Sequence, residues 1–343
     1  MNRELLKYLT RANAVAGNEG EVRKVILADC RAYADEVITD GLGSLILHHK
    51  GREKKIMLAA HMDEVGFLIR SISDIGLCSV MPLGGVKPYA RTDQPVVVTA
   101  RNRNHIYGFL QSEYRDGKAE NTYVDCGMDS KQEVPDAGIR PGDMVTFASE
   151  GHDCSENRFM AKALDDRTGC EVLAEVLKQY QGNLDVYCCF TSSEEVGTRG
   201  SATCADLIRP DAAIVVDVAC WHSEWDRGYQ NNRQLGEGPM LVLYDKTCVG
   251  NQAFAWIAEA EAEKAGIAIQ PDMFSGGGTD AGSIHLRNGG TPVLTLGIPL
   301  RYCHTSMSFC DLRDLAACEK LIGLVLDDLE ENGLERLSYA NEL

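Results

Sequence analysis

Two adjacent glutamates, Glu194 and Glu195, are the residues whose type and position point most directly to chemistry. They follow the apolar run 186–190 and precede Gly197, a pattern that predicts a buried strand ending in a tight loop. Two neighbouring carboxylates at the mouth of a buried strand are costly in free energy unless a cation pairs with them. That cation is either a bound metal ion or a pair of basic side chains, and the two glutamates alone do not distinguish these cases.

The ends of other predicted elements carry further side chains of metal-ligand type. These residues are His61, Asp63, Asp165, Asp217 and His304. In open α/β sheets, ligands bind outside the carboxyl ends of the strands, so these side chains are expected to converge. Imidazoles and carboxylates together match a divalent metal such as zinc, cobalt or manganese.

Each of these residues also has an ordinary structural interpretation. An isolated histidine such as His61 is more often a hydrogen-bonded core residue than a ligand. Asp165 and Asp166 could cap a helix, which is a common use of aspartate. Asp217 could close a turn, and His304 could lie on a loop. We favour the metal site because all five positions place a ligand type at an element end beside a buried run.

The number of candidate ligands predicts two metal ions. Two terminal histidines, two terminal carboxylates and one bridging carboxylate would hold a pair of ions roughly 3.5–4 Å apart. One of the two adjacent glutamates would then be a ligand, and the other would be free to act as a general base. Asp63 would accept a hydrogen bond from the far ring nitrogen of His61 and so orient the imidazole.

The sequence contains two kinds of pattern, and they predict the elements that position these residues. In residues 1–66 and 160–343, apolar strands alternate with amphipathic helices, which predicts a three-layer α/β/α domain carrying the candidate site. Residues 67–159 instead contain short β-like runs separated by turns, which predicts a small, inserted all-β domain with a barrel-like form. The poorly patterned stretch 221–237 is predicted to be a long loop over the active site.

Composition excludes several classes of protein. Charged residues make up 25% of the chain and hydrophobic residues 44%, the balance of a globular protein. No apolar run approaches the roughly 18 residues that a membrane span needs. The formal net charge of −17 disfavours nucleic acid and anionic membranes as partners. Because the N-terminus also lacks the features of a signal peptide, we expect a cytoplasmic protein.

The thirteen cysteines are an odd number, and no two have the C-x-x-C spacing of a thiolate zinc site. A disulfide scaffold is not expected in a chain of this length. Most of the cysteines lie in apolar surroundings, so the sequence predicts buried, reduced thiols.

The motifs together resemble those of the glutamyl aminopeptidase or tetrahedral (TET) aminopeptidase family of dinuclear metallopeptidases. The resemblance covers nearly the whole chain in the same order, at residues 60–67 (AHMDEVGF), 82–85 (PLGG), 140–143 (RPGD), 162–167 (KALDDR), 193–197 (SEEVG), 216–218 (VDV), 276–281 (GGGTDA) and 302–304 (YCH). Some relatives have been labelled cellulases, endoglucanases or deblocking enzymes.

The resemblance implies a metal centre with two divalent ions per subunit, most simply zinc, with cobalt or manganese as alternatives. The implied ligands are His61, Asp165, Glu195, Asp217 and His304. Asp165 would bridge the ions. His61 and either Glu195 or Asp217 would be terminal ligands, and His304 would bind the other ion.

The implied activity is removal of N-terminal residues from peptides, with Glu194 as general base and Asp63 as the residue that orients His61. The inserted domain would help dimers to form, and dimers would assemble into a tetrahedral dodecamer. The chain departs from the family at residues 305–306, which are Thr-Ser where Ser-Pro is expected. The stretch 111–121 is also shorter than expected, which affects the expected inter-subunit contacts.

Three other functions fit parts of the pattern. A second kind of dinuclear amidohydrolase, such as a carboxypeptidase or an N-acyl amino acid deacylase, would not need a free α-amine on its substrate. A non-catalytic, metal-stabilised assembly protein would bind metal without turnover. A thiol-dependent hydrolase would use Cys303 beside His304 and would resist chelators.

Overall fold

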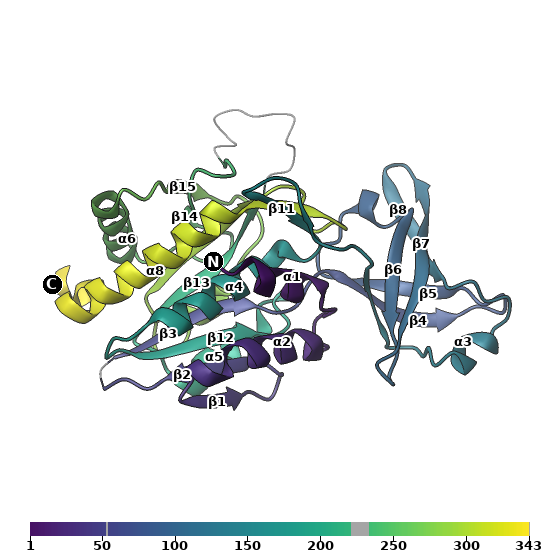
Figure 1. Ribbon diagram of the computed structural model, residues 1–343, viewed down its shortest axis with the longest axis horizontal. Helices are drawn as coiled ribbons and strands as arrows, with labels where there is room; N and C mark the ends of the chain where they lie inside the picture. The colour runs from purple at the N-terminus through teal and green to yellow at the C-terminus, as the bar shows by residue number, and fades with distance from the viewer. Residues whose placement is uncertain (53, 221–232, 343) are drawn as a thin grey trace.

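The centre of the protein is a mixed sheet of eight strands in the order β1-β2-β12-β3-β13-β16-β14-β15 (Figure 1). The computed structural model describes residues 1–52, 54–220 and 233–342. The strands of this sheet are β1 (Glu36–Thr39), β2 (Leu45–His49), β3 (Lys55–His61), β12 (Asp185–Thr191), β13 (Ala212–Cys220), β14 (Met240–Tyr244), β15 (Gln270–Met273) and β16 (Val293–Leu300). Strands β12, β3, β13 and β16 are parallel. They read as continuous apolar runs because both of their faces are buried.

Helices cover both faces of this sheet. Alternate residues of β3 show the division, because Ile56 and Leu58 join the larger core whereas Met57 and Ala59 join the smaller one. The larger core is covered by α1 (Arg3–Arg11), α2 (Gly20–Cys30), α4 (Leu164–Gln179), α6 (Gln252–Ala265) and α8 (Leu312–Asn332). The smaller core is covered by α5 (Arg199–Ile208) and α7 (Ala281–Ile284). The predicted three-layer α/β/α arrangement is therefore confirmed.

A closed β-barrel forms the other end of the molecule (Figure 1). Its strands follow one another around the barrel as β4 (Gly66–Ile72), β5 (Cys78–Leu83), β8 (Lys118–Asp125), β7 (His105–Arg115), β6 (Gln94–Thr99) and β9 (Met144–Phe147). Inward-facing residues such as Phe67, Val96 and Phe147 form its separate core. The inserted barrel-like fold is confirmed. The sequence does not predict β8, because most of its side chains are polar and at least partly exposed.

The chain returns from the barrel through a three-stranded sheet of β10 (His152–Asp153), β11 (Arg158–Ala161) and β17 (Ser308–Asp311). The domain boundaries at 67 and 159 stay a prediction. The remaining short helices are η1 (Arg31–Tyr33), η2 (Pro88–Ala90), α3 (Glu133–Asp136), η3 (Glu335–Leu337) and η4 (Tyr339–Glu342). Among the described helices, none has the length and hydrophobicity to cross a membrane. The predicted loop 221–237 falls largely outside the described residues.

One pair of cysteines contradicts the expectation of reduced thiols. Cys220 and Cys303 form a disulfide, with their Cα atoms 6.0 Å apart. Cys220 ends β13 and Cys303 follows the neighbouring strand β16, so sheet order brings together two residues that are 83 positions apart. Spacing along the chain could not reveal this pair. The other eleven cysteines have no disulfide partner within the described part of the chain.

Candidate active site

The candidate site lies at the carboxyl ends of the parallel strands. His61 is the last residue of β3 and pairs in register with Thr191, the last residue of β12. Asp217 lies inside β13, not after it as the sequence suggests, because β13 continues to Cys220. The pairing of β13 with β3 stops at Val215, which pairs with Ala59, and the same register places Asp217 level with His61, the last residue of β3. Side chains of metal-ligand type gather at this edge of the sheet, and the space that they surround is called the recess below.

Asp165 lies between the two histidines. One of its carboxylate oxygens is 3.2 Å from Nε2 of His61, and the other is 3.1 Å from Nε2 of His304. Its neighbour Asp166 has a different role, since its carboxylate accepts hydrogen bonds from the backbone N–H of Gly169 at 2.9 Å and of His61 at 3.2 Å. The helix-cap interpretation thus fits Asp166, whereas Asp165 points into the recess.

The five predicted ligands form two groups that share Asp165. In one group, ligand atoms of His61, Asp165 and Asp217 all lie within 4.8 Å of one another. In the other group, the same is true of Asp165, Glu195 and His304. This geometry places Asp217 in the group of His61 and Glu195 in the group of His304. The sequence alone leaves open which of these two carboxylates accompanies His61.

Glu194 belongs to neither of these groups. Nε2 of His61 lies 3.9 Å from Oε2 of Glu194. The side chain of Glu194 is nevertheless only 11% exposed. Glu194 is therefore a carboxylate inside the recess that no ligand group uses.

Asp63 contacts the site differently from the sequence prediction. Its main-chain carbonyl, not its carboxylate, is nearest to Nδ1 of His61, at 3.0 Å against 3.6 Å. The buried carboxylate instead accepts the backbone N–H groups of Glu194 at 2.9 Å and Glu195 at 3.1 Å. Asp63 thus orients His61 through its backbone and holds the two glutamates through its side chain.

The electrostatics of the recess show a deficit of positive charge. Burial and repulsion from nearby carboxylates raise the pKa of Glu194 and of Asp217 well above the usual range. Burial also raises the pKa of Glu195 to about 7, although His304 opposes this shift. Burial alone would lower the pKa of His304, but Glu195 and Asp165 raise it to about 9. Two imidazoles are too few to neutralise these carboxylates.

Divalent cations would supply the missing charge, and the donor set fits them. One carboxylate oxygen of Glu195, Oε1, is buried and has no hydrogen-bond partner within the described structure. A buried polar atom without a partner is costly in free energy unless a ligand completes it. Imidazole and carboxylate donors at the ends of strands suit zinc, cobalt or manganese.

Comparison with known proteins shows the family of this chain. A family model described as M42 glutamyl aminopeptidase matches residues 43–321, and a model described as AMPT matches residues 2–26. The chain belongs to the M42 glutamyl aminopeptidase family. It is accordingly an enzyme of the hydrolase class.

Individual M42 relatives match almost end to end. Lysyl aminopeptidase of Pyrococcus furiosus is 30% identical over 340 residues, covering 95% of this chain and 97% of the relative. A TET aminopeptidase from Thaumarchaeota archaeon SCGC AB-539-E09 superposes with a TM-score of 0.92 and 31% identity, covering 98% of each chain. The TET1 peptidase of Pyrococcus horikoshii, which can assemble into a tetrahedron or a large octahedral shell, superposes with a TM-score of 0.85 and 28% identity, covering 94% of this chain and 98% of its own.

The sequence analysis does not predict a buried ion-pair network that lies behind the candidate ligands. Nζ of Lys162 lies 2.6 and 2.9 Å from the two carboxylate oxygens of Glu64, and Arg167 lies 3.3 Å from the same carboxylate. Lys162 and Arg167 flank Asp165 in sequence, and Glu64 follows Asp63. The network therefore ties together two ligand-bearing segments. Charged residues inside otherwise apolar motifs are the signal that could have revealed it.

Removing Lys162 should destabilise the fold. Lys162→Met leaves Glu64 buried with a longer contact to Arg167, and breaking a buried ion pair costs about 3–5 kcal/mol. We expect a loss of this size in the free energy of unfolding, measured by urea denaturation. Lys54→Met is the control, because Lys54 is 52% exposed in its ion pair with Asp211. A loss below about 1 kcal/mol, typical of exposed pairs, would contradict the role of the network.

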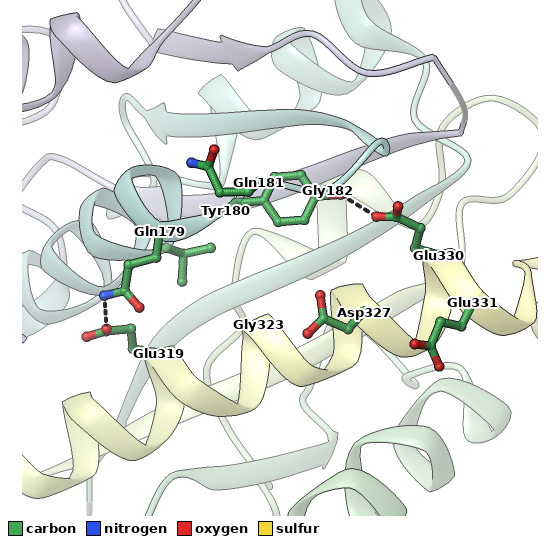
Figure 2. A pocket seen from close by; sticks show the side chains of 10 residues that line it. Gln179, Tyr180, Gln181, Gly182, Glu319, Gly323, Asp327, Glu330 and Glu331 are labelled. Carbon is green, nitrogen blue, oxygen red and sulfur yellow. Dashed lines mark hydrogen bonds between the residues drawn. The ribbon is translucent and has the colours of Figure 1, made fainter.

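Two hollows of this M42 chain that are larger than the cavity at the candidate site lie away from the candidate ligands. One, of about 520 Å³, lies between the end of α4 and α8 and carries Glu319, Asp327, Glu330 and Glu331 (Figure 2). Its lining contains no histidine, and Glu330 already accepts a hydrogen bond from the hydroxyl of Tyr180 at 3.2 Å. The cavity beside Asp165 and His304 measures only about 10 Å³. Chemistry, not cavity size, identifies the candidate site.

Proposed function

We propose that this protein is a metal-dependent aminopeptidase that hydrolyses the N-terminal peptide bond of peptides. The observation that carries the proposal is the pair of ligand groups sharing Asp165, with Glu194 buried beside them but outside both groups. The two groups match a dinuclear centre with one bridging and two sets of terminal ligands.

In this proposal, His61 and Asp217 would hold one divalent ion, Glu195 and His304 would hold the other, and Asp165 would contact both. When bound, the ions polarise the scissile carbonyl and make the attacking water more acidic. The natural metal is proposed to be zinc, with cobalt or manganese as alternatives.

Glu194 would move the proton in this reaction. Its carboxylate would accept a proton from the attacking water and return it to the leaving amine. Burial and neighbouring carboxylates raise the pKa of Glu194, and carboxylates with perturbed pKa values cluster at catalytic sites. Asp63 would hold Glu194 in place, since it fixes the backbone of the glutamate pair through two hydrogen bonds.

The protein is further proposed to act as a homo-oligomer. The TET1 peptidase relative can assemble into a tetrahedron or a large octahedral shell, and in this proposal the barrel would help dimers to form. A dodecamer built from dimers is the specific assembly proposed, together with a cytoplasmic location. The substrates would be short peptides with a free α-amine.

The proposal is tested by metal removal and reconstitution. Chelated enzyme should be inactive on a panel of aminoacyl chromogenic substrates, and zinc, cobalt or manganese added separately should restore activity. N-acetylated versions of the same substrates should not be cleaved, because an aminopeptidase requires the free α-amine. Full activity after exhaustive chelation, or preference for acylated substrates, would contradict the proposal.

A further inference from the structure

The turn Gly84–Gly85, which follows β5, brings the barrel into contact with two candidate ligands. Phe147 of β9 lines the cavity beside the same ligands. The backbone carbonyl of Gly85 lies 3.2 Å from Nδ1 of His304. Two residues on, the backbone N–H of Lys87 donates to the carbonyl of His304 at 3.0 Å. The barrel therefore contacts both the ring and the backbone of this ligand.

The contact with the ring determines which nitrogen faces the site. When Nδ1 carries the proton and donates it to Gly85, Nε2 is left as the electron-pair donor. Nε2 is the atom that lies 3.1 Å from Asp165. The backbone of His304 has a φ of +61°, in the left-handed region that is sparsely populated by residues other than glycine. Such a conformation persists only where its surroundings hold it.

The turn fits these ligands only because it lacks side chains. A Cβ atom on Gly85 would lie 2.8 Å from Nδ1 of His304, and a Cβ atom on Gly84 would lie 2.9 Å from Oε2 of Glu195. Both distances are below 3.0 Å, which is closer than Cβ atoms in real proteins approach other heavy atoms. Gly84 also has a φ of +72°, which favours glycine by itself, whereas the backbone of Gly85 lies outside the left-handed region. At Gly85, then, the contact with His304 is the reason that an alanine would not fit.

The two ligand groups differ in whether the Gly84–Gly85 turn of the barrel contacts them. The hydrogen bonds that described residues make with His61 come from Asp63, Asp165, Asp166 and Cys170, which all belong to segments of the α/β domain. Asp217 lies within the central sheet. In contrast, Glu195 and His304 both adjoin the turn of the barrel.

We propose that the Gly84–Gly85 turn is a positioning element for one of the two metal ions, the one held by Glu195 and His304. The barrel thus controls the occupancy of that position, while the position formed by His61 and Asp217 is independent of it. This inference rests on the proposed dinuclear function. It assigns the inserted domain a role inside the active site, beyond that of an assembly surface.

The test is a metal titration of the full-length Gly85→Ala variant. Zinc binding to the chelated protein is measured by calorimetry, and bound metal is counted after gel filtration. Loss of an outer hydrogen bond to a metal-ligating histidine typically weakens metal affinity by about 10- to 100-fold. We expect a loss of this size for one of the two equivalents and no change for the other. Gly41→Ala is the matched control, because a Cβ atom there would meet nothing within 4 Å.

A second variant identifies which ion is affected. His304→Ala should weaken the same equivalent, and adding Gly85→Ala to it should cause no further loss, because the ring that the new methyl group would meet is absent. Thermal unfolding of each variant checks that the fold is intact. Two unchanged equivalents in Gly85→Ala, or equal weakening of both, would overturn the inference. If the wild-type protein bound fewer than two equivalents, the proposed dinuclear function itself would fail.

Discussion

Replacing Glu194 with glutamine is expected to lower kcat by about 100- to 10,000-fold, the range that general acid–base catalysis contributes. Glutamine has nearly the same shape, but its amide cannot accept a proton at neutral pH. The hydrogen bond from the backbone N–H of residue 194 to Asp63 would remain, because it does not involve the side chain. KM and metal content should change little, since Glu194 lies outside both ligand groups.

The measurement pairs steady-state kinetics with metal counting on the same preparation. Glu195→Gln is the matched comparison, because it makes the identical change one residue along the chain at a proposed ligand. It should lose one equivalent of metal as well as activity. Near-normal kcat in Glu194→Gln would show that the base is misassigned, and loss of metal from that variant would show that Glu194 is a ligand.

Asp165→Asn is expected to have the broadest effect, because it removes the charge that both ligand groups share. An asparagine offers one carbonyl oxygen and no net charge, so it cannot bind two metal ions as a bridging carboxylate would. We expect the affinity for each of the two equivalents to fall by more than about 100-fold, which exceeds the effect of losing an outer hydrogen bond. At ordinary metal concentrations, enzyme activity should fall as the affinity for metal falls.

Asp217→Asn provides the contrast for this experiment. It makes the same chemical change in only one group, so a single equivalent should weaken while the other stays bound. Calorimetric titration of both variants with zinc distinguishes the cases. Two separable sites in Asp165→Asn, with one unaffected, would rule out the bridging role.

The sequence predicted much of the candidate site because its side chains of metal-ligand type follow a local rule. His61, the glutamate pair and His304 each come after an apolar run, and that pattern can be recognised without knowing where the strands lie. The apolar runs also predicted the parallel strands, since a strand buried on both faces carries few polar residues. After residue 66 the pattern changes to short β-like runs separated by turns, and this change predicted the barrel. Family resemblance, not spacing, separated the roles of Glu194 and Glu195.

Tertiary structure decided how these residues are combined. The order of strands placed Asp217 with His61 and Glu195 with His304, and it joined Cys220 to Cys303 against expectation. It also directed the carboxylate of Asp63 to the amides of the glutamate pair, and not to His61. These contacts join segments far apart in the chain, and periodicity reports only the burial of each segment by itself. Sheet order and domain docking set the distances between segments, so only the folded structure could show which ligands meet.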